Sequence, residues 1–245
     1  MRLKCFSCEA LARVVYHCAA QSPHLIDVEL LQLGLHDNPG DLRRSLQARI
    51  DATNPEYDAI VLVYGLCGKA TEGLTARAVP LVIPRAHDCI TLLLGSRERY
   101  QSEFDADPGT YWYSLDYVER GRPGALALGA ATPSLDLKAE YDKFVAKYGK
   151  DNADYLMDVM GAWQKHYHRA AFVDMGVGDS QPVEAKAQAD AAKHGWAFQR
   201  VAGDLVLIRR LLEGDWQDDF LMVPPGERIA QSFDDGIVCA LRTPP

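Results

Sequence analysis

The chain has 245 residues, of which 48% are hydrophobic and 24% are charged, so it can bury a core and is too apolar for wholesale disorder. A formal net charge of −8 argues against a general nucleic-acid binder, because neutralising phosphates requires a basic face. No apolar run approaches the ~20 residues that cross a bilayer, so we expect no membrane partner. The first twenty residues carry Glu9 and Arg13 and indicate a strand and a helix rather than a secretory signal.

Short apolar strands alternate with amphipathic helices in the first part of the chain. We expect strands at 1–6, 26–33, 57–64 and 79–84, and helices at 8–21 and 38–52. The run 57–64 (YDAIVLVY) is continuously apolar, as strands buried on both faces of a parallel sheet are. This alternation predicts an α/β fold, Rossmann-like, with mostly parallel sheets and flanking helices.

The second half carries a further α/β pattern after an irregular stretch. We expect a loop at 100–124, helices at 137–148, 153–167, 181–194 and 203–212, and strands at 168–175, 197–202, 220–223 and 236–241. The predicted organisation is therefore two lobes. Residues 1–125 form an N-terminal α/β lobe, and residues 126–245 form a helical segment followed by a second α/β lobe.

Three of the six cysteines follow predicted strands. Cys8 comes after the first strand, Cys67 after the strand that ends at Tyr64, and Cys89 after the strand that ends near Pro84. Ligands of open α/β sheets gather beyond the carboxyl ends of the strands, so these thiols are expected to converge there. Nearby helix N-termini would lower their pKa values and favour thiolates. Three protein ligands with an open fourth position are typical of catalytic zinc, and three thiolates can also hold an iron–sulfur cluster.

Buried thiols without chemistry are the competing interpretation. Free cysteine is among the most buried residue types, and Cys18 and Cys239 fit that role well. Cys5 and Cys8 form a Cys-x-x-Cys pair that could act in redox chemistry, but Cys5 lies in the body of the strand and Cys8 beyond its end. In a reducing cytoplasm, where we expect the protein to reside, none of the six is expected to form a disulfide.

Polar residues beside Cys89 are candidates for catalysis. His87 is a candidate fourth ligand or base, although an exposed loop histidine is equally common. Asp88 could act on substrate or simply cap the following helix. Arg85 could bind a carboxylate or phosphate group, or remain solvated.

Two glycine-containing loops follow predicted strands. Gly65 and Gly68 lie in Tyr-Gly-Leu-Cys-Gly, which lacks the spacing of a triphosphate-binding loop. Gly176 and Gly178 supply two of the three glycines of a dinucleotide fingerprint, so their backbone N–H groups could hold an anionic cofactor or only form a tight turn.

Several of these segments together resemble a known family. They are Ser7-Cys8-Glu9, Leu35-His36-Asp37-Asn38-Pro39, Tyr64-Gly65-Leu66-Cys67-Gly68, Ile83-Pro84-Arg85-Ala86-His87-Asp88-Cys89-Ile90, Leu94-Gly95-Ser96 and the Pro-Gly-Thr-Tyr-Trp run from Pro108. The chain resembles a bacterial and archaeal family catalogued as domain of unknown function 1638, over most of residues 5–115 and more loosely beyond. The resemblance implies that Cys8, Cys67, His87 and Cys89 are the site positions. It also implies a link to corrinoid-dependent methyl or one-carbon metabolism, since family members often neighbour genes for such methyltransferases.

Three functional hypotheses follow. The first is a metal-dependent enzyme, of transferase or lyase type, whose zinc or iron–sulfur site lies in a cleft between the lobes and acts on a small-molecule substrate. The second is a non-enzymatic protein that handles a metal or a corrinoid for a corrinoid protein or methyltransferase. The third is a small-ligand-binding protein with core cysteines only.

Overall fold

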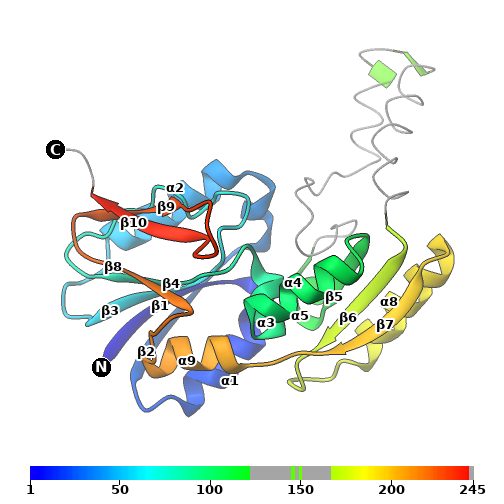
Figure 1. The fold of residues 1–245 in the computed structure, drawn as a ribbon, viewed down its shortest axis with the longest axis horizontal. Coiled ribbons are helices and arrows are strands. Elements are labelled where there is room, and N and C mark those ends of the chain that lie inside the picture. Colours follow the sequence, from blue (N-terminus) through cyan, green and yellow to red (C-terminus); the bar gives the residue numbers. More distant parts are fainter. Residues whose placement is uncertain (122–144, 147–148, 151–166, 243–245) are drawn as a thin grey trace.

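A computed structural model of the chain describes residues 1–121, 145–146, 149–150 and 167–242. Its strands form a five-stranded sheet, a three-stranded sheet and a two-stranded hairpin, with helices packed around them (Figure 1). The predicted mixed α/β fold with mostly parallel sheets is confirmed.

The first sheet has the order β2-β1-β3-β4-β8. Its strands are β1 (Arg2–Cys8), β2 (Leu25–Leu31), β3 (Ala59–Val63), β4 (Leu81–Pro84) and β8 (Phe220–Val223). The first four run parallel, and β8 pairs antiparallel with β4 at the edge. Every residue of β3 and β4 is buried, as their continuous apolar sequences require.

Helices cover both faces of the first sheet. Helices α1 (Ala12–Gln21) and α9 (Val206–Glu213) contact each other on one face, and α2 (Pro39–Asp51) lies on the other (Figure 1). Helix α2 begins where Asn38 caps Gly40 N–H at 3.0 Å and Pro39 supplies the fixed φ of a first turn.

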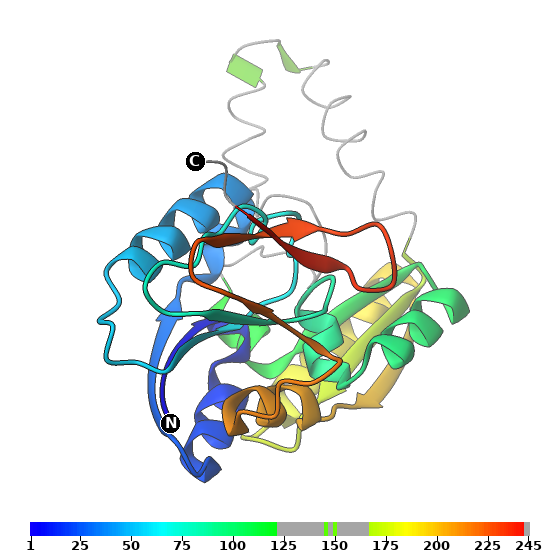
Figure 2. The same cartoon turned by 60° about the vertical axis from the view of Figure 1, so that its left-hand side comes forward.

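The hairpin packs beside the first sheet. Its strands are β9 (Glu227–Gln231) and β10 (Val238–Arg242), and β9 forms a bridge with the segment before β4 through Thr75 and Arg228. Figure 2 shows this hairpin lying across the segment that leads into β4.

The second sheet has the order β5-β6-β7, all parallel. It comprises β5 (Thr110–Ser114), β6 (Arg169–Asp174) and β7 (Ala197–Ala202), and α8 (Gln181–His194) packs on it. Helices α3 (Cys89–Leu94) and α4 (Arg97–Ala106) connect β4 of the first sheet to β5 of the second, and α5 (Leu115–Arg120) follows β5 (Figure 1). A separate apolar cluster of Tyr111, Tyr113, Phe172 and neighbours fills the far side of this sheet.

One expectation requires correction. The segment 100–124 is not a loop as far as residue 121, because α4, β5 and α5 occupy it. The predicted helices at 137–148 and 153–167, and the predicted boundary at 125/126, lie largely outside the described residues, so the division into two lobes stays a prediction. Strand β8 comes late in the chain and pairs with β4 in the first sheet.

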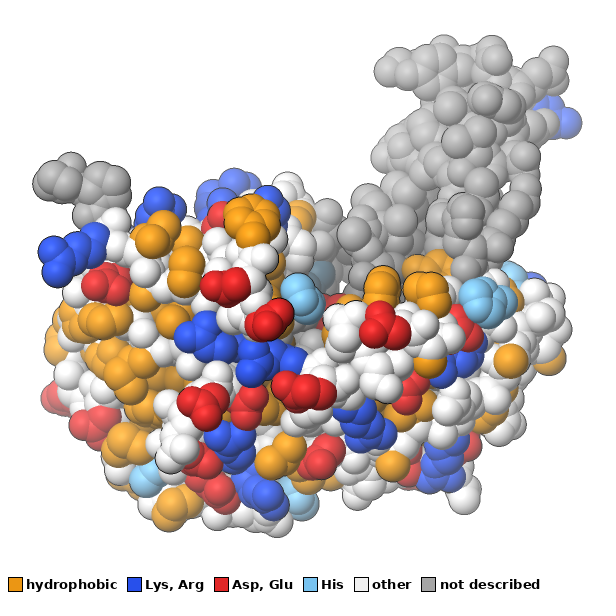
Figure 3. Space-filling model, viewed as in Figure 1, with side chains coloured by type: hydrophobic (Ala, Val, Ile, Leu, Met, Phe, Trp, Pro, Cys, Tyr) orange, Lys and Arg blue, Asp and Glu red, His pale blue; other side chains and the backbone are white. Residues whose placement is uncertain are grey.

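Charged side chains of both signs lie on the face drawn in Figure 3. Acidic and basic side chains are interspersed there among the described residues rather than gathered in a continuous basic surface. Within the described residues, no helix is both long and apolar enough to cross a membrane.

Candidate functional site

The first sheet brings Cys8, Cys67 and Cys89 to one edge; we call them the cysteine triad. Cys8 is the last residue of β1, while Cys67 and Cys89 lie in the segments that follow β3 and β4. Strands β1, β3 and β4 are consecutive neighbours and parallel, so their carboxyl ends coincide. The strand order reverses between β1 and β3, which makes this the switch point where open α/β sheets bind ligands.

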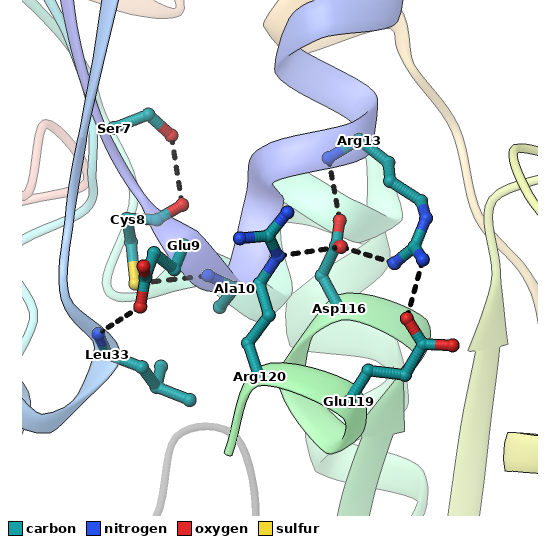
Figure 4. A network of polar contacts seen from close by, with 9 residues as sticks. All are labelled: Ser7, Cys8, Glu9, Ala10, Arg13, Leu33, Asp116, Glu119 and Arg120. Atoms are coloured by element: carbon teal, nitrogen blue, oxygen red, sulfur yellow. Dashed lines mark hydrogen bonds and ion pairs between the residues drawn. The ribbon is translucent and has the colours of Figure 1, made fainter.

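Hydrogen bonds fix the turn that carries Cys8 (Figure 4). The Cys8 sulfur accepts from Ala10 N–H at 3.4 Å, and Glu9 accepts from Leu33 N–H at 3.1 Å. The next turn is tied to α5, because the Asp116 carboxylate accepts from Arg13 N–H at 2.7 Å and from its guanidinium at 2.6 Å. The position of Cys8 therefore depends on contacts from the segment that follows β2 and from α5.

The loop of Cys67 has an unusual backbone. Cys67, Gly68 and Lys69 have consecutive positive φ values of 47°, 61° and 71°. A left-handed conformation costs a non-glycine residue roughly 1–2 kcal/mol, and such strain clusters at functional sites. Two bonds of 2.8 Å hold the loop to the segment before Cys89, from Leu66 N–H to Ala86 O and from Cys67 N–H to His87 O.

Gly65 allows these two loops to approach each other. A Cβ atom at this position would lie 2.6 Å from Asp88 N and 2.8 Å from Ala86 O, which are distances that no side chain tolerates. Gly65 is therefore required for close packing of the loops that carry Cys67 and Cys89.

Burial dominates the electrostatics of the cysteine triad. Burial raises the pKa of Cys8 to about 12 and raises the pKa values of Cys67 and Cys89 further. The negative charge of Cys8 contributes to the raised pKa of both other thiols, and Cys67 contributes to that of Cys89. The expected lowering of the thiol pKa values by helix N-termini is thus outweighed by burial.

Asp88, His87 and Arg85 have distinct roles. The Asp88 carboxylate caps α3, accepting from Ile90 N–H at 2.9 Å and Thr91 N–H at 3.3 Å, and burial raises its pKa. His87 is exposed, and its ring lies 6.1 Å from that of Tyr100. Arg85 donates to the carbonyls of Gly236 and Val238 at 3.0 and 2.6 Å, so its guanidinium anchors the hairpin.

The glycines predicted to bind a cofactor lie at two separate places. Gly65 and Gly68 belong to the triad edge, whereas Gly176 and Gly178 follow β6 in the second sheet. Asp174 accepts from Gly176 N–H at 3.1 Å, so this amide already has an intramolecular partner. Gly178 approaches Arg13, since an added Cβ would lie 3.1 Å from its Cδ atom.

Two aromatic residues at this edge were not predicted as site residues. Tyr64 follows β3 directly and is 1% exposed, and the charges of Cys8 and Cys67 help to raise its pKa after burial itself. The His36 ring stacks on it with centroids 6.0 Å apart. Tyr64 ends an apolar run, so the sequence indicated a core residue. The available signal in the sequence was its place three residues before Cys67.

The remaining cysteines are not part of the triad. Cys5 and Cys18 are buried, Cys239 is partly buried in β10, and all six cysteines are free thiols. Within the described ranges, no group of three His, Cys, Asp or Glu side chains already has a spacing that would hold a metal ion. The triad is therefore a cluster of neighbouring thiols rather than a closed metal cage.

Comparison with known proteins identifies the family but no activity. The family model described as "Protein of unknown function (DUF1638)" matches residues 30–212, a range that includes Cys67 and Cys89 but not Cys8. No curated protein and no solved structure matches the chain. Because the match covers well over half of its length, the chain belongs to the DUF1638 family.

Proposed function

We propose that the cysteine triad binds one thiophilic metal ion, zinc in the first instance, and that the protein is a metal-dependent enzyme. The observation that carries this proposal is the placement of three free thiols at the carboxyl ends of the neighbouring parallel strands β1, β3 and β4. The carboxylates of Glu9, Asp88 and Asp116 each contribute to the raised pKa of at least one of these thiols, and negatively charged neighbours favour a bound cation.

The donor set also fits such an ion chemically. Thiolates are the ligands of zinc and of iron–sulfur clusters, and three of them leave one position open for a substrate. A bound zinc ion would supply Lewis-acid activation of a ligand at that position. Binding requires the three side chains to close on the ion and to release their protons, so the pKa values raised by burial make metal affinity strongly dependent on pH.

The chain's own groups have separate tasks in this proposal. Asp88 and Gly65 hold the loops of Cys67 and Cys89 in place. His87, exposed beside this edge, is the residue we assign to proton transfer with a small-molecule substrate. Methyl or one-carbon transfer with a corrinoid protein or methyltransferase as partner, in a reducing cytoplasm, rests on the family resemblance described above.

Elemental analysis of protein purified without oxygen tests the proposal. We expect about one zinc per chain that survives dialysis. The Cys67→Ala and Cys89→Ala variants should lose the metal. The Cys239→Ala variant, which lacks a free cysteine of β10, should retain it.

The outcomes separate the alternatives. Several irons per chain with matching sulfide and a visible absorption would identify the bound group as an iron–sulfur cluster instead of zinc. Equal metal in all three variants would refute the triad as the site. Protein that contains no metal under these conditions would indicate that the three cysteines are core thiols. This result would favour a small-ligand-binding protein.

A further inference from the structure

Strand β7 is the outer strand of the second sheet, and in the part of the chain that the structure describes it pairs with β6 alone (Figure 1). Ala197 N–H donates to His168 O at 2.8 Å on the side of β6. Because successive residues of a strand direct their backbone groups to alternate sides, Phe198 and Arg200 direct theirs away from β6. Two N–H groups and two C=O groups therefore face outward along this edge.

The other three outer strands of the two sheets are protected against pairing with a further strand. Every residue of β5 is buried, and β8 has only four residues and is followed by Pro224 and Pro225. In β2, an antiparallel register centred on Asp27, on Glu29 or on Val28 between them would place carboxylates of two copies opposite each other. Charge, proline and short length are common protections of sheet edges. Strand β7 has six residues and contains neither a proline nor an acidic residue.

The charged residue of β7 does not protect its edge either. The Arg200 guanidinium forms ion pairs with the carboxylates of Asp174 and Glu184 in the same chain. Its charge is thus neutralised within the protomer. Arg99 donates to Ala202 O and so occupies only the end of the strand. The outward backbone groups in the middle of β7 remain accessible to a second strand.

We propose that β7 pairs antiparallel with β7 of a second copy of this chain, so that two three-stranded sheets join into one continuous sheet. The two-fold axis passes through Gln199. Phe198 of each copy then lies opposite Arg200 of the other, and each of these two pairs exchanges two main-chain hydrogen bonds. The interface is independent of the cysteine triad.

The sequence of β7 selects this partner and this register. With the axis at Gln199, an aromatic ring faces an arginine side chain twice, which is a favourable cross-strand contact, and no like charges meet. An axis at Arg200 would place two guanidinium groups directly opposite each other. An axis at Phe198 would pair only residues 197–199 of the strand. A second copy therefore supplies a complementary strand without any further protein.

Sedimentation velocity of the full chain over a range of concentrations tests the interface. We expect a monomer–dimer equilibrium in the wild type. Phe198→Arg should weaken dimerisation about tenfold or more, because it places an arginine opposite Arg200 in both symmetric pairs. Phe233→Arg is the matched control, since this side chain is 93% exposed between β9 and β10, and it should leave the equilibrium unchanged.

Disulfide cross-linking tests the register. Residues on the two-fold axis of this pair have Cα atoms about 4.5 Å apart, which is within the range of a disulfide. Gln199→Cys should therefore form a covalent dimer under mild oxidation. Ala197→Cys is the control, because residue 197 is also exposed but its two Cα atoms would lie roughly 14 Å apart. The wild type is oxidised in parallel because it carries six free thiols of its own.

The remaining outcomes overturn the inference. A wild type that stays monomeric at every concentration, with no cross-link in Gln199→Cys, would show that β7 does not pair with itself. Equal dimerisation of folded Phe198→Arg and the wild type would place the interface on another surface. Equal cross-linking of Gln199→Cys, Ala197→Cys and the wild type would contradict the register. If a low melting temperature shows that Phe198→Arg does not fold, the two cysteine variants decide the question alone.

Discussion

Asp116 offers the sharpest test of how the site is held. This carboxylate in α5 is 5% exposed and accepts from Arg13 N–H at 2.7 Å, the Arg13 guanidinium at 2.6 Å and Arg120 Nε at 3.2 Å (Figure 4). Asp116→Ala removes all three bonds. It leaves the N–H of Arg13, in the first turn of α1, without its partner.

The magnitude follows from the kind of bond lost. A hydrogen bond from a backbone N–H to a carboxylate contributes about 1.5–3 kcal/mol. Both arginine side chains are 36% exposed, so solvent screens each ion pair to about 0.5 kcal/mol. We expect Asp116→Ala to lower the free energy of unfolding by about 2.5–4 kcal/mol, and Asp116→Asn by about half as much, because its amide oxygen can still accept from Arg13 N–H.

Urea unfolding followed by circular dichroism measures these values. Glu119→Gln is the control, since this carboxylate is 41% exposed and pairs only with the Arg13 guanidinium among the described residues; it should cost less than about 0.5 kcal/mol. An Asp116→Ala variant within about 0.5 kcal/mol of the wild type would refute the reasoning. The same variant should bind metal more weakly, because the turn after Cys8 loses its support.

Three further predictions concern other parts of the chain. Gly65→Ala should lower the free energy of unfolding by about 1–3 kcal/mol and weaken metal binding, because the new Cβ would overlap Asp88 N; urea unfolding and metal analysis measure both. Asp174→Asn should lower the free energy of unfolding by about 0.5–1 kcal/mol at neutral pH, because the hydrogen bond that Arg200 donates to Asp174 lowers the pKa of this carboxyl group. Urea unfolding at a series of pH values measures this difference. Cys18→Ala should retain full metal content by elemental analysis, because this thiol packs on the apolar face of α1.

The outcomes that would contradict them differ. A Gly65→Ala protein with native stability would mean that the two loops can separate freely. For Asp174, the stabilisation is present above the carboxyl pKa of the unfolded chain and is lost as pH falls through the lowered folded value. If the wild type remained more stable than Asp174→Asn in strong acid, the stabilisation could not come from the ionised carboxylate of Asp174. Loss of metal in Cys18→Ala would show that the metal is not bound at the carboxyl ends of β1, β3 and β4.

Much of the first sheet could be predicted from its sequence. The apolar run that became β3 and the Asn38-Pro39 start of α2 carry strong local signals, and both were confirmed. The helix α4 was missed because its ten residues have no buried face, so no apolar periodicity marks it. Strand β5 was missed because its aromatic residues lie between turn-forming neighbours, and its burial depends on β6 much later in the chain.

The candidate site was only partly predictable. The three cysteines could be predicted to lie together, because each follows a predicted strand and the carboxyl ends of parallel strands meet at one edge of the sheet. The anchoring of Arg85 by the hairpin and the stacking of His36 on Tyr64 depend on pairings between distant segments. The pKa values of the thiols were predicted in the wrong direction, because burial is a property of the folded core and not of a local helix start.

The late arrival of β8 has a consequence for biosynthesis. Strand β4 is fully buried and apolar, yet the strand that covers its edge follows only after the whole second sheet. At roughly 5–20 residues per second, a ribosome leaves this edge open for on the order of ten seconds. An uncovered apolar edge is a template for pairing with other chains. Nascent chains should therefore be most prone to aggregation, and most dependent on chaperones, in the interval before β8 emerges.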